Sequence, residues 1–436
     1  MGLSRRDHCH VVKIILTGEG FSPAERKTEG RAVMRKALFC LLNNFFLVLI
    51  SFLLVSASVQ PVCAGEREWL ILVYVSGNND RGLAGSVNEL VNSLEKVGSS
   101  EKVTVITHYA SLEKSKEGHL QFPREAKTRL IRHDTDNLQI TSPVLDTSTR
   151  IDMADEQNLL LFARKNIFKY PSKKVMLLLW GKGEGFKGLM HDDLSRKHMT
   201  LKKLAGALAK VKESTGRKID IFATDADLMQ MAEVVYELKD YAQIIIGFEG
   251  DASDTGYYYD LILQDVVAEP AMTPQALANS MTYFSKSMIS SAIRTDKMPG
   301  FVKLMNQWTS EIMKDPAALK AAASAIDRTF YFRMKDSKDL CDYIDKVNES
   351  LAAQSPSVQA GNQLKDYIRN ELIFAYGMTS DLKEKKALTR NERIHGLAIY
   401  LPDLIYDASA YEPLAFASDS QWRNFLMAVL KEKLKK

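Results

Sequence analysis

The chain has 436 residues, of which 46% are apolar and 26% are charged. These proportions are typical of a globular protein and exclude a low-complexity or intrinsically disordered chain. Eight of the 58 basic residues and four of the 54 acidic residues lie in residues 1–64, so residues 65–436 are neutral overall. Because this neutral body carries no basic patch, nucleic acid is not expected as a partner.

The N-terminal segment has the pattern of a signal peptide. Arg35 and Lys36 precede an apolar run over residues 37–59, and small residues then lead to Ala64. We expect a Sec-type signal peptide over residues 34–64, cleaved after Ala64. The mature protein is therefore expected to be exported, either to the periplasm or out of the cell.

An uncleaved anchor is the alternative interpretation of this segment, because about 20 apolar residues can span a bilayer. Only in that case is the membrane expected as a partner. Residues 1–33 precede Met34 and are interpreted as an untranslated or disordered extension. Cys341 is the one cysteine that remains after cleavage, so we expect no internal disulfide.

Residues 65–270 alternate between strand and helix patterns. Continuous apolar runs predict buried strands at residues 69–75, 103–108, 175–180, 219–223 and 243–248. Apolar residues at helical spacing lie between these runs, and Thr200 is a good N-cap for one of the helices. This alternation predicts an α/β fold with a mostly parallel sheet and helices on both sides.

The remainder of the chain is mainly helical in pattern. Thr273 and Pro274 give a helix start, and residues 396–401 return to a strand pattern before a last helix near residues 422–434. The chain is therefore divided into the extension 1–33, the signal peptide 34–64, an α/β core 65–270, a helical region or second lobe 271–390, and a C-terminal strand and helix, 391–436, that rejoin the core.

Polar and glycine-rich turns follow two of the predicted strands. Residues 180–186 are Trp-Gly-Lys-Gly-Glu-Gly-Phe, and residues 224–229 are Thr-Asp-Ala-Asp-Leu-Met. In open α/β sheets, ligand and active sites gather at the carboxyl ends of the strands. We therefore expect the functional site where these two turns meet.

These turns resemble the two catalytic motifs of the clostripain family of cysteine peptidases. In that family one strand ends in Trp-Asp-His-Gly-Ser-Gly-Trp, whose histidine is the general base. A later strand ends in Asp-Ala-Cys-Leu-Met, whose cysteine is the nucleophile. The matching positions here are Trp180, Gly183, Gly185, Asp225, Ala226, Leu228 and Met229.

Further stretches in the same order, including residues 69–79, 151–155 and 395–402, extend this resemblance over most of residues 67–436. The resemblance implies a caspase-like α/β fold with a helical elaboration. Calcium dependence occurs among relatives, but no ligand set can be placed in this sequence. We therefore expect no cofactor and no metal site, with calcium as a possibility by resemblance alone.

The resemblance puts Lys182 at the family's histidine position and Asp227 at its cysteine position. A cysteine peptidase needs a thiolate and a base within hydrogen-bond reach. A carboxylate is a poor nucleophile toward an amide, and a lysine ammonium has no lone pair at neutral pH. We therefore expect no catalytic residue, and we predict a Lys182–Asp227 ion pair or a network that includes Glu184.

Other roles are open for the residues of these turns. Asp227 is a candidate N-cap for the following helix. By resemblance Asp225 is the acid that lines the pocket for a basic side chain, and it either binds an Arg or Lys of a peptide or ties down its own turn. Cys341 is expected to be a packed core position. His191 and His198 are expected to be loop residues without a nucleophile to serve.

The expected function is an exported pseudopeptidase that holds a peptide or protein partner in the former cleft, with a partner that carries an Arg or Lys side chain as one possibility. Its binding residues are Lys182, Glu184, Asp225 and Asp227. One alternative is an active peptidase or another hydrolase with displaced catalytic residues. Another alternative is a structural envelope protein with an inert cleft.

Overall fold

The computed structural model describes residues 66–83, 85–111, 113–114, 120–121, 125–149, 151–193, 195–286, 289–377 and 393–435. The predictions for residues 1–64, which are the extension and the signal peptide, lie outside these ranges. So does the stretch of the predicted helical region from residue 378 to 390. No helix within the described ranges is both long and apolar enough to cross a membrane.

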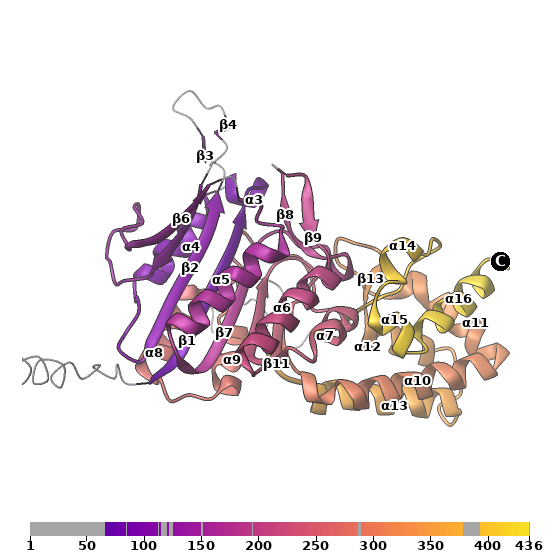
Figure 1. The fold of residues 1–436 in the computed structure, drawn as a ribbon. Helices are drawn as coiled ribbons and strands as arrows, with labels where there is room; N and C mark the ends of the chain where they lie inside the picture. Colours follow the sequence, from indigo (N-terminus) through magenta and orange to yellow (C-terminus); the bar gives the residue numbers. More distant parts are fainter. Residues whose placement is uncertain are drawn as a thin grey trace, which may run out of the picture. The chain divides into compact units, whose positions relative to one another are not determined.

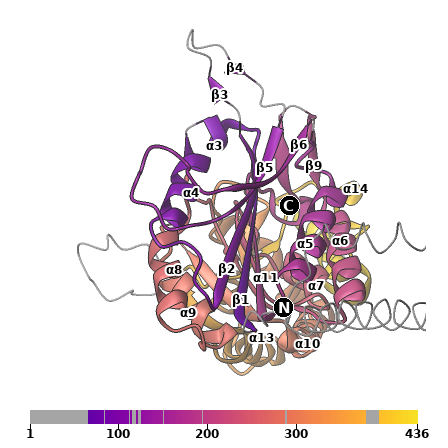
Figure 2. The ribbon, with the colours of Figure 1, turned by 60° about the vertical axis from the view of Figure 1, so that its left-hand side comes forward.

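A nine-stranded sheet lies at the centre of residues 66–377, with helices on both of its faces (Figure 1 and Figure 2). Five neighbouring strands run parallel. In sheet order they are β11 (Ala242–Phe248), β10 (Ile219–Asp225), β7 (Ser172–Trp180), β1 (Arg67–Gly77) and β2 (Val103–Ser111). They form where the apolar runs predict them, because a parallel strand covered on both faces needs apolar side chains on both.

Two antiparallel strands extend each edge of this parallel centre, and the sequence patterns missed all four. On the side of β11 they are β12 (Ser290–Arg294) and β14 (Ile373–Gly377). On the side of β2 they are β5 (Glu125–Leu130) and β6 (Val144–Thr149). Since β12 and β14 belong to the central sheet, the predicted boundary at residue 270 between core and helical region is wrong.

Each face of the sheet packs against three helices. One face carries α4 (Ser86–Glu95), α8 (Tyr259–Ala268) and α9 (Pro274–Tyr283). The other face carries α5 (Glu156–Lys169), α6 (Leu201–Thr215) and α7 (Ala232–Leu238). The predicted helix starts at Thr200 and Thr273 are confirmed, since their hydroxyls accept hydrogen bonds from Lys203 N and Ala276 N.

The helical region packs around its own aromatic centre. Its helices are α10 (Met298–Lys314), α11 (Pro316–Ala325), α12 (Leu340–Asn348) and α13 (Pro356–Tyr367). The C-terminal helices α14 (Ala408–Tyr411), α15 (Ala415–Asp419) and α16 (Trp422–Lys433) follow. Trp422 of α16 stacks on Trp308 with ring centroids 6.5 Å apart, so the last helix packs against the helical region and not against the core.

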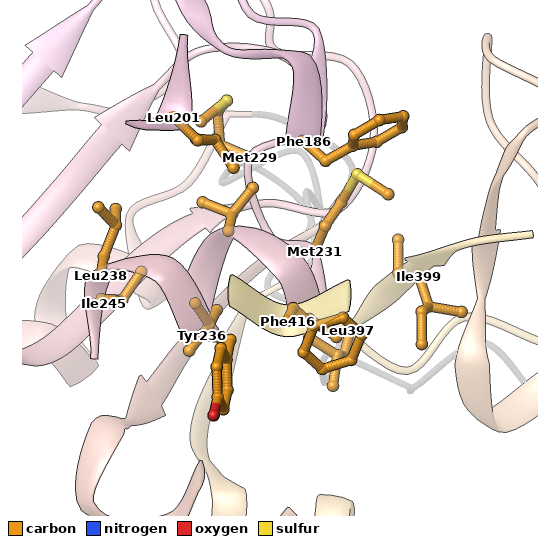
Figure 3. Close-up of a cluster of buried hydrophobic side chains, with 14 of the residues drawn as sticks. Phe186, Leu201, Met229, Met231, Tyr236, Leu238, Ile245, Leu397, Ile399 and Phe416 are labelled. Carbon is orange, nitrogen blue, oxygen red and sulfur yellow. The ribbon is translucent and has the colours of Figure 1, made fainter. Parts of the chain in front are cut away.

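The C-terminal strand returns to the core through α7 and not through the central sheet. Strand β15 (Ala398–Tyr400) pairs with β13 (Ser337–Asp339) in a separate two-stranded sheet. Its Ala398 N donates to Gln230 O over 3.0 Å. Figure 3 shows Leu397 and Ile399 in one apolar cluster with Met231 and Phe416.

Three buried acids, here called the C-terminal clasp, hold the main chain of this returning segment. They are Asp339, Glu249 and Glu233, which accept hydrogen bonds from His395 N at 2.5 Å, Gly396 N at 2.7 Å and Tyr400 N at 3.0 Å. Asp339 lies in β13, Glu249 directly follows β11 and Glu233 lies in α7, and all three are at most 1% exposed. Buried backbone N–H groups need acceptors, so the clasp fixes where the segment lies.

Short elements complete the described residues. They are α3 (Asp80–Leu83), β3 (Glu113–Lys114), β4 (Leu120–Gln121), β8 (Leu189–Asp192), β9 (Lys197–Met199) and the single turns η1 (Gly185–Lys187), η2 (Thr295–Lys297), η3 (Ile326–Arg328) and η4 (Ile368–Leu372). Strands β8 and β9 form a hairpin directly after η1.

Candidate functional site

The two predicted turns meet at the carboxyl ends of β7 and β10. Trp180 and Asp225 are partners in the parallel ladder, and Gly181 N donates to Asp225 O over 3.1 Å. Lys182 and Asp227 therefore each lie two residues beyond a paired position. Gly183 has no room for a side chain, because a Cβ there would collide with the carbonyl oxygen of Asp227. The sequence thus correctly predicts that the two turns touch.

Lys182 forms an ion pair at the rim of the site. Its Nζ lies 3.0 Å from Asp80 Oδ2, and 35% of the Lys182 side chain and 66% of the Asp80 side chain are exposed. Asp80 opens α3 just after β1. The predicted Lys182–Asp227 ion pair is wrong: within the described residues, Asp227 pairs with Arg333 instead. The Lys182 ammonium pairs instead with Asp80, which lies just beyond β1, the strand next to β7.

Asp227 is almost fully enclosed, with 7% of its side chain exposed. Its Oδ1 accepts a hydrogen bond from Ala252 N at 2.7 Å, and its Oδ2 lies 3.3 Å from the Arg333 guanidinium. The predicted capping role is wrong, because α7 begins only at Ala232 and has Met231 at its N-cap. Through these contacts Asp227 instead connects the loop after β11, which contains Ala252, to the loop of the helical region that contains Arg333.

A left-handed residue explains why the helix starts late. Leu228, which follows Asp227, has φ +61° and no exposed surface. Its backbone N donates to Gly250 O over 2.9 Å. A leucine with this φ cannot belong to an α-helix, so the chain turns before α7 begins. The sequence offered no sign of this turn, because leucine there fits the apolar periodicity of the helix.

Asp225 is completely buried and holds the loop that follows β11. Its Oδ2 accepts hydrogen bonds from Gly256 N at 2.8 Å and from the Tyr259 hydroxyl at 2.5 Å. These contacts give Asp225 a structural role, as one of the two predictions had it. They fix the neighbouring loop, however, and not the turn to which Asp225 belongs. Its carboxylate has no surface in contact with solvent.

Glu184 brings an imidazole next to Lys182. Its Oε2 lies 3.6 Å from His191 Nε2 on the β8–β9 hairpin, and His191 stacks on His198 with centroids 5.0 Å apart. Burial lowers the pKa of His191, Glu184 opposes this shift, and the charges of His198 and Lys182 lower the pKa further. His191 is therefore neutral at neutral pH, and sequence reasoning missed its place beside the site.

A cysteine and a histidine do meet in the protein, where β13, α12 and the residues before β15 come together. The metal-ligand type atoms of Asp339, Cys341 and His395 all lie within 4.8 Å of one another. Cys341 is buried in the main apolar cluster, as predicted. All three side chains are at most 1% exposed, so a peptide has no access to them. No sequence signal connects these residues, since 54 positions separate Cys341 from His395.

The same cluster is the candidate metal centre of the described residues. Thiolate and imidazole suit zinc-like ions and not calcium, which prefers oxygen ligands. The Asp339 carboxylate already accepts hydrogen bonds from Asp342 N, His395 N and His395 Nδ1. With its oxygens occupied in this way, Asp339 orients His395 and caps α12.

Most of the chain matches a known protein family. The model of the clostripain family of peptidases matches residues 73–429 of the chain. A search of curated protein sequences found no match.

Solved structures give the same fold. A secreted C11 cysteine protease from Bacteroides thetaiotaomicron in complex with an irreversible peptide inhibitor is 16% identical, with a TM-score of 0.58 over 83% of this chain and 99% of that chain. An inactive zymogen C11 protease from Parabacteroides distasonis is 17% identical, with a TM-score of 0.59 over 81% of this chain and 98% of that chain. At these identities the likeness concerns the fold alone, and it confirms the predicted caspase-like α/β architecture.

Proposed function

Because the chain belongs to the clostripain family, we propose that it is a pseudopeptidase, which binds a peptide or protein partner at the former active site without cleaving it. The observation that carries this proposal is the chemistry of the two turns. The positions that match the family's base and nucleophile hold Lys182 and Asp227. An ammonium has no lone pair to accept a proton, and a carboxylate attacks amides poorly.

The contacts of both residues support a loss of catalysis. Lys182 is paired with Asp80, and both oxygens of Asp227 are engaged, one by Ala252 N and one by Arg333. Peptide hydrolysis would require a group at these positions that is free to attack or to take up a proton. Cys341, the one cysteine among the described residues, is completely buried at the start of α12.

The surface charges of the site support a partner with charged groups. Glu184 and Asp80 expose 42% and 66% of their side chains, and Lys182 exposes 35%. Exposed charges of both signs favour orientation of a polar segment through complementary charges. Asp225 is the weakest of the four predicted binding residues, because a ligand would have to open the Gly256–Tyr259 contacts to reach it.

We also propose that the protein acts outside the cytoplasm. The basis is the apolar segment at residues 37–59, preceded by Arg35 and Lys36 and followed by Ala64. Its similar structures include a protease that is described as secreted.

One observation favours an active enzyme as the second candidate. His191 provides a neutral imidazole beside Lys182, at the side of the site where the family has its base. This candidate still lacks a nucleophile, since Asp227 is the group that β10 presents. A structural envelope protein with an inert site is the third candidate, and it predicts no peptide binding.

The test is an assay of the purified protein on peptide reporters that contain Arg or Lys. We expect no turnover by the unmodified protein and measurable turnover by Lys182→His/Asp227→Cys, because Arg333 beside the new thiol would favour its thiolate. Lys182→Gln/Asp227→Ser is the matched control, since it changes the same two positions without supplying a thiolate and an imidazole.

The outcomes separate the three candidates. Turnover by the unmodified protein would refute the pseudopeptidase, and its loss in His191→Gln would identify the displaced base. Binding of the reporter peptide without turnover, measured by fluorescence anisotropy, is the result expected of a pseudopeptidase. Absence of both binding and turnover would leave the structural role.

A further inference from the structure

A second cavity lies at one edge of the central sheet, between α5 and the strands β2, β5 and β6. Its volume is about 390 Å³, which is typical of sites for small molecules. Among the described residues that line it, none belongs to the two turns. A ligand of this cavity would therefore be bound independently of the proposed function of the turns.

His108 on β2 lines the cavity and is only 4% exposed. Its ring stacks on Tyr74 and on Phe162, with centroids 5.4 and 5.3 Å away, and its Nδ1 lies 2.8 Å from Thr128 Oγ1. The other ring nitrogen, Nε2, is buried and has no hydrogen-bond partner among the described residues. Because most buried polar atoms are hydrogen-bonded, such an atom in the lining of a cavity indicates a group that binds there.

The charge of His108 decides which groups suit it. Burial lowers the pKa of His108 to about 4, Asp146 opposes this shift, and the charge of Lys165 adds to it. The ring is therefore neutral at neutral pH, and Nε2 donates or accepts a hydrogen bond according to the tautomer. A hydroxyl group satisfies Nε2 in both cases, because it is both a donor and an acceptor. A charged group is unsuitable there, since burial of an unpaired charge costs much free energy.

Two exposed apolar side chains line the outer part of the cavity. They are Leu161 and Phe168 of α5, which are 53% and 59% exposed. They lie about two helical turns apart, on a side of α5 where polar residues would be expected. They favour a ligand with an apolar body, and an aromatic ring would also pack on Phe162. Because Nε2 is covered in the free protein, such a ring enters as these exposed side chains move aside.

Charged side chains surround the same opening. Arg164 and Lys165 of α5 and Asp146 of β6 all line the cavity. Lys165 Nζ lies 2.6 Å from Asp146 Oδ2, and 59% and 46% of the two side chains are exposed. Two positive charges and one negative charge leave a net positive charge at the opening, which favours an anionic group on the ligand. A carboxylate at this exposed position avoids the cost of burying its charge.

We propose that this cavity binds a phenol that carries a carboxylate. The phenol hydroxyl bonds to His108 Nε2, and the ring packs on Phe162 and Leu161. The carboxylate lies at the opening, near Arg164 and Lys165. Either a free aromatic acid or a tyrosine at the carboxyl end of a polypeptide offers this chemistry.

The direct experiment is isothermal titration calorimetry of the unmodified protein with three related probes. N-acetyltyrosine is expected to bind at least about tenfold more tightly than N-acetylphenylalanine, which lacks the hydroxyl, and than N-acetyltyrosinamide, which lacks the carboxylate. 4-Hydroxyphenylacetate is measured beside them to separate the two sources. Tighter binding of this probe than of N-acetyltyrosine would indicate a free aromatic acid, and the reverse order would indicate the end of a polypeptide.

Two variants assign the preferences to residues. His108→Phe keeps an aromatic ring in the stack without its nitrogens, so it is expected to bind N-acetyltyrosine and N-acetylphenylalanine equally. Arg164→Gln is expected to reduce the preference for N-acetyltyrosine over its amide at least about threefold, because it removes positive charge from the opening. Lys169→Gln is the matched control, since it removes an exposed positive charge of the same helix that does not line the cavity.

A blocking variant keeps the proposal testable if His108→Phe fails to fold, as judged by circular dichroism. Leu161→Trp changes an exposed side chain and fills the opening, so it is expected to abolish binding of every probe. Absence of binding to the unmodified protein, or equal affinities for N-acetyltyrosine and N-acetylphenylalanine, would refute the site. Unchanged binding by Leu161→Trp would also refute it, because the probe would then be bound elsewhere.

Discussion

The two turns and the C-terminal clasp use the same kinds of charged residue in opposite settings. At the turns, Lys182 and Arg333 pair with acids at distances of 3.0 and 3.3 Å, and each keeps at least 35% of its side chain in solvent. In the clasp, Glu233, Glu249 and Asp339 are at most 1% exposed and bind backbone N–H groups. An ion pair that is exposed on both sides, such as Lys182–Asp80, exchanges partners easily, whereas buried acceptors cannot be removed without leaving a donor unsatisfied. The turns are therefore suited to ligands and the clasp to holding the fold.

The largest expected effect is that of Asp339→Ala in the clasp. The change removes the cap of α12 and the acceptor for both His395 N and His395 Nδ1, so it should lower the free energy of unfolding by about 3 kcal/mol or more. Urea denaturation measures this loss. Asp315→Ala is the control, because Asp315 caps α11 at an exposed position and should cost about 1 kcal/mol. Equal losses for the two variants would contradict the distinction between buried and exposed acids.

Glu233 is expected to have a somewhat smaller effect on the free energy of unfolding, and this effect depends on pH. Burial raises the pKa of Glu233 from 4.5 to about 7, and hydrogen bonds from Tyr400 and Tyr411 only partly oppose the shift. Because the pKa in the folded protein lies above that in the unfolded chain, the stabilisation is complete below about pH 4.5 and is lost as the pH rises through 7. Between these two pH limits the contribution of Glu233 to the free energy of unfolding changes by about 3 kcal/mol.

Glu233→Gln should remove this pH dependence. We expect the variant to be relatively more stable at pH 8 than at pH 5 when it is compared with the unmodified protein in urea denaturation at both values. Glu412→Gln serves as the control, since the Arg423 hydrogen bond lowers the pKa of Glu412 at the surface. A parallel pH profile for Glu233→Gln and the unmodified protein would show that Glu233 does not titrate in this range.

The smallest effect is expected from Lys182→Ala at the turns. The ion pair with Asp80 is exposed on both sides, so its loss should change the free energy of unfolding by less than about 0.5 kcal/mol. Thermal denaturation of the variant measures the change. A loss above about 1 kcal/mol would mean that Lys182 supports the fold, and the turns would then no longer contrast with the clasp.

The sequence predicts the centre of the sheet well because local pattern and tertiary environment agree there. Residues 69–75 and 175–180 are apolar throughout, and both runs form strands that are buried on both faces. The four outer strands are short, and β5, β6 and β12 are also more polar. Strand β6, for example, is mostly exposed, and only its pairing with β5 makes it a strand.

The meeting of the two turns was predicted but the contacts of their side chains were not, and the reason is distance along the chain. The ladder that joins β7 to β10 brings the two turns together, and strand order could be anticipated from the α/β alternation. The partner of Asp227 comes from residue 333, on a loop between two elements of the helical region. No periodicity or motif relates residues that lie so far apart. Charge complementarity alone therefore predicted Lys182 as the partner of Asp227, whereas the partner in the structure is Arg333.

Leu228 shows that packing alone can hold a strained turn in place. Its left-handed φ of +61° costs about 1–2 kcal/mol in backbone energy, which glycine would avoid. Its side chain is fully buried, however, and burial of a leucine contributes about 1.5–3 kcal/mol. Replacement by glycine would therefore lose about as much as it gains or more, so drift toward a relaxed turn brings no benefit. The shape of this turn is then preserved by packing, whether or not Asp227 takes part in any chemistry.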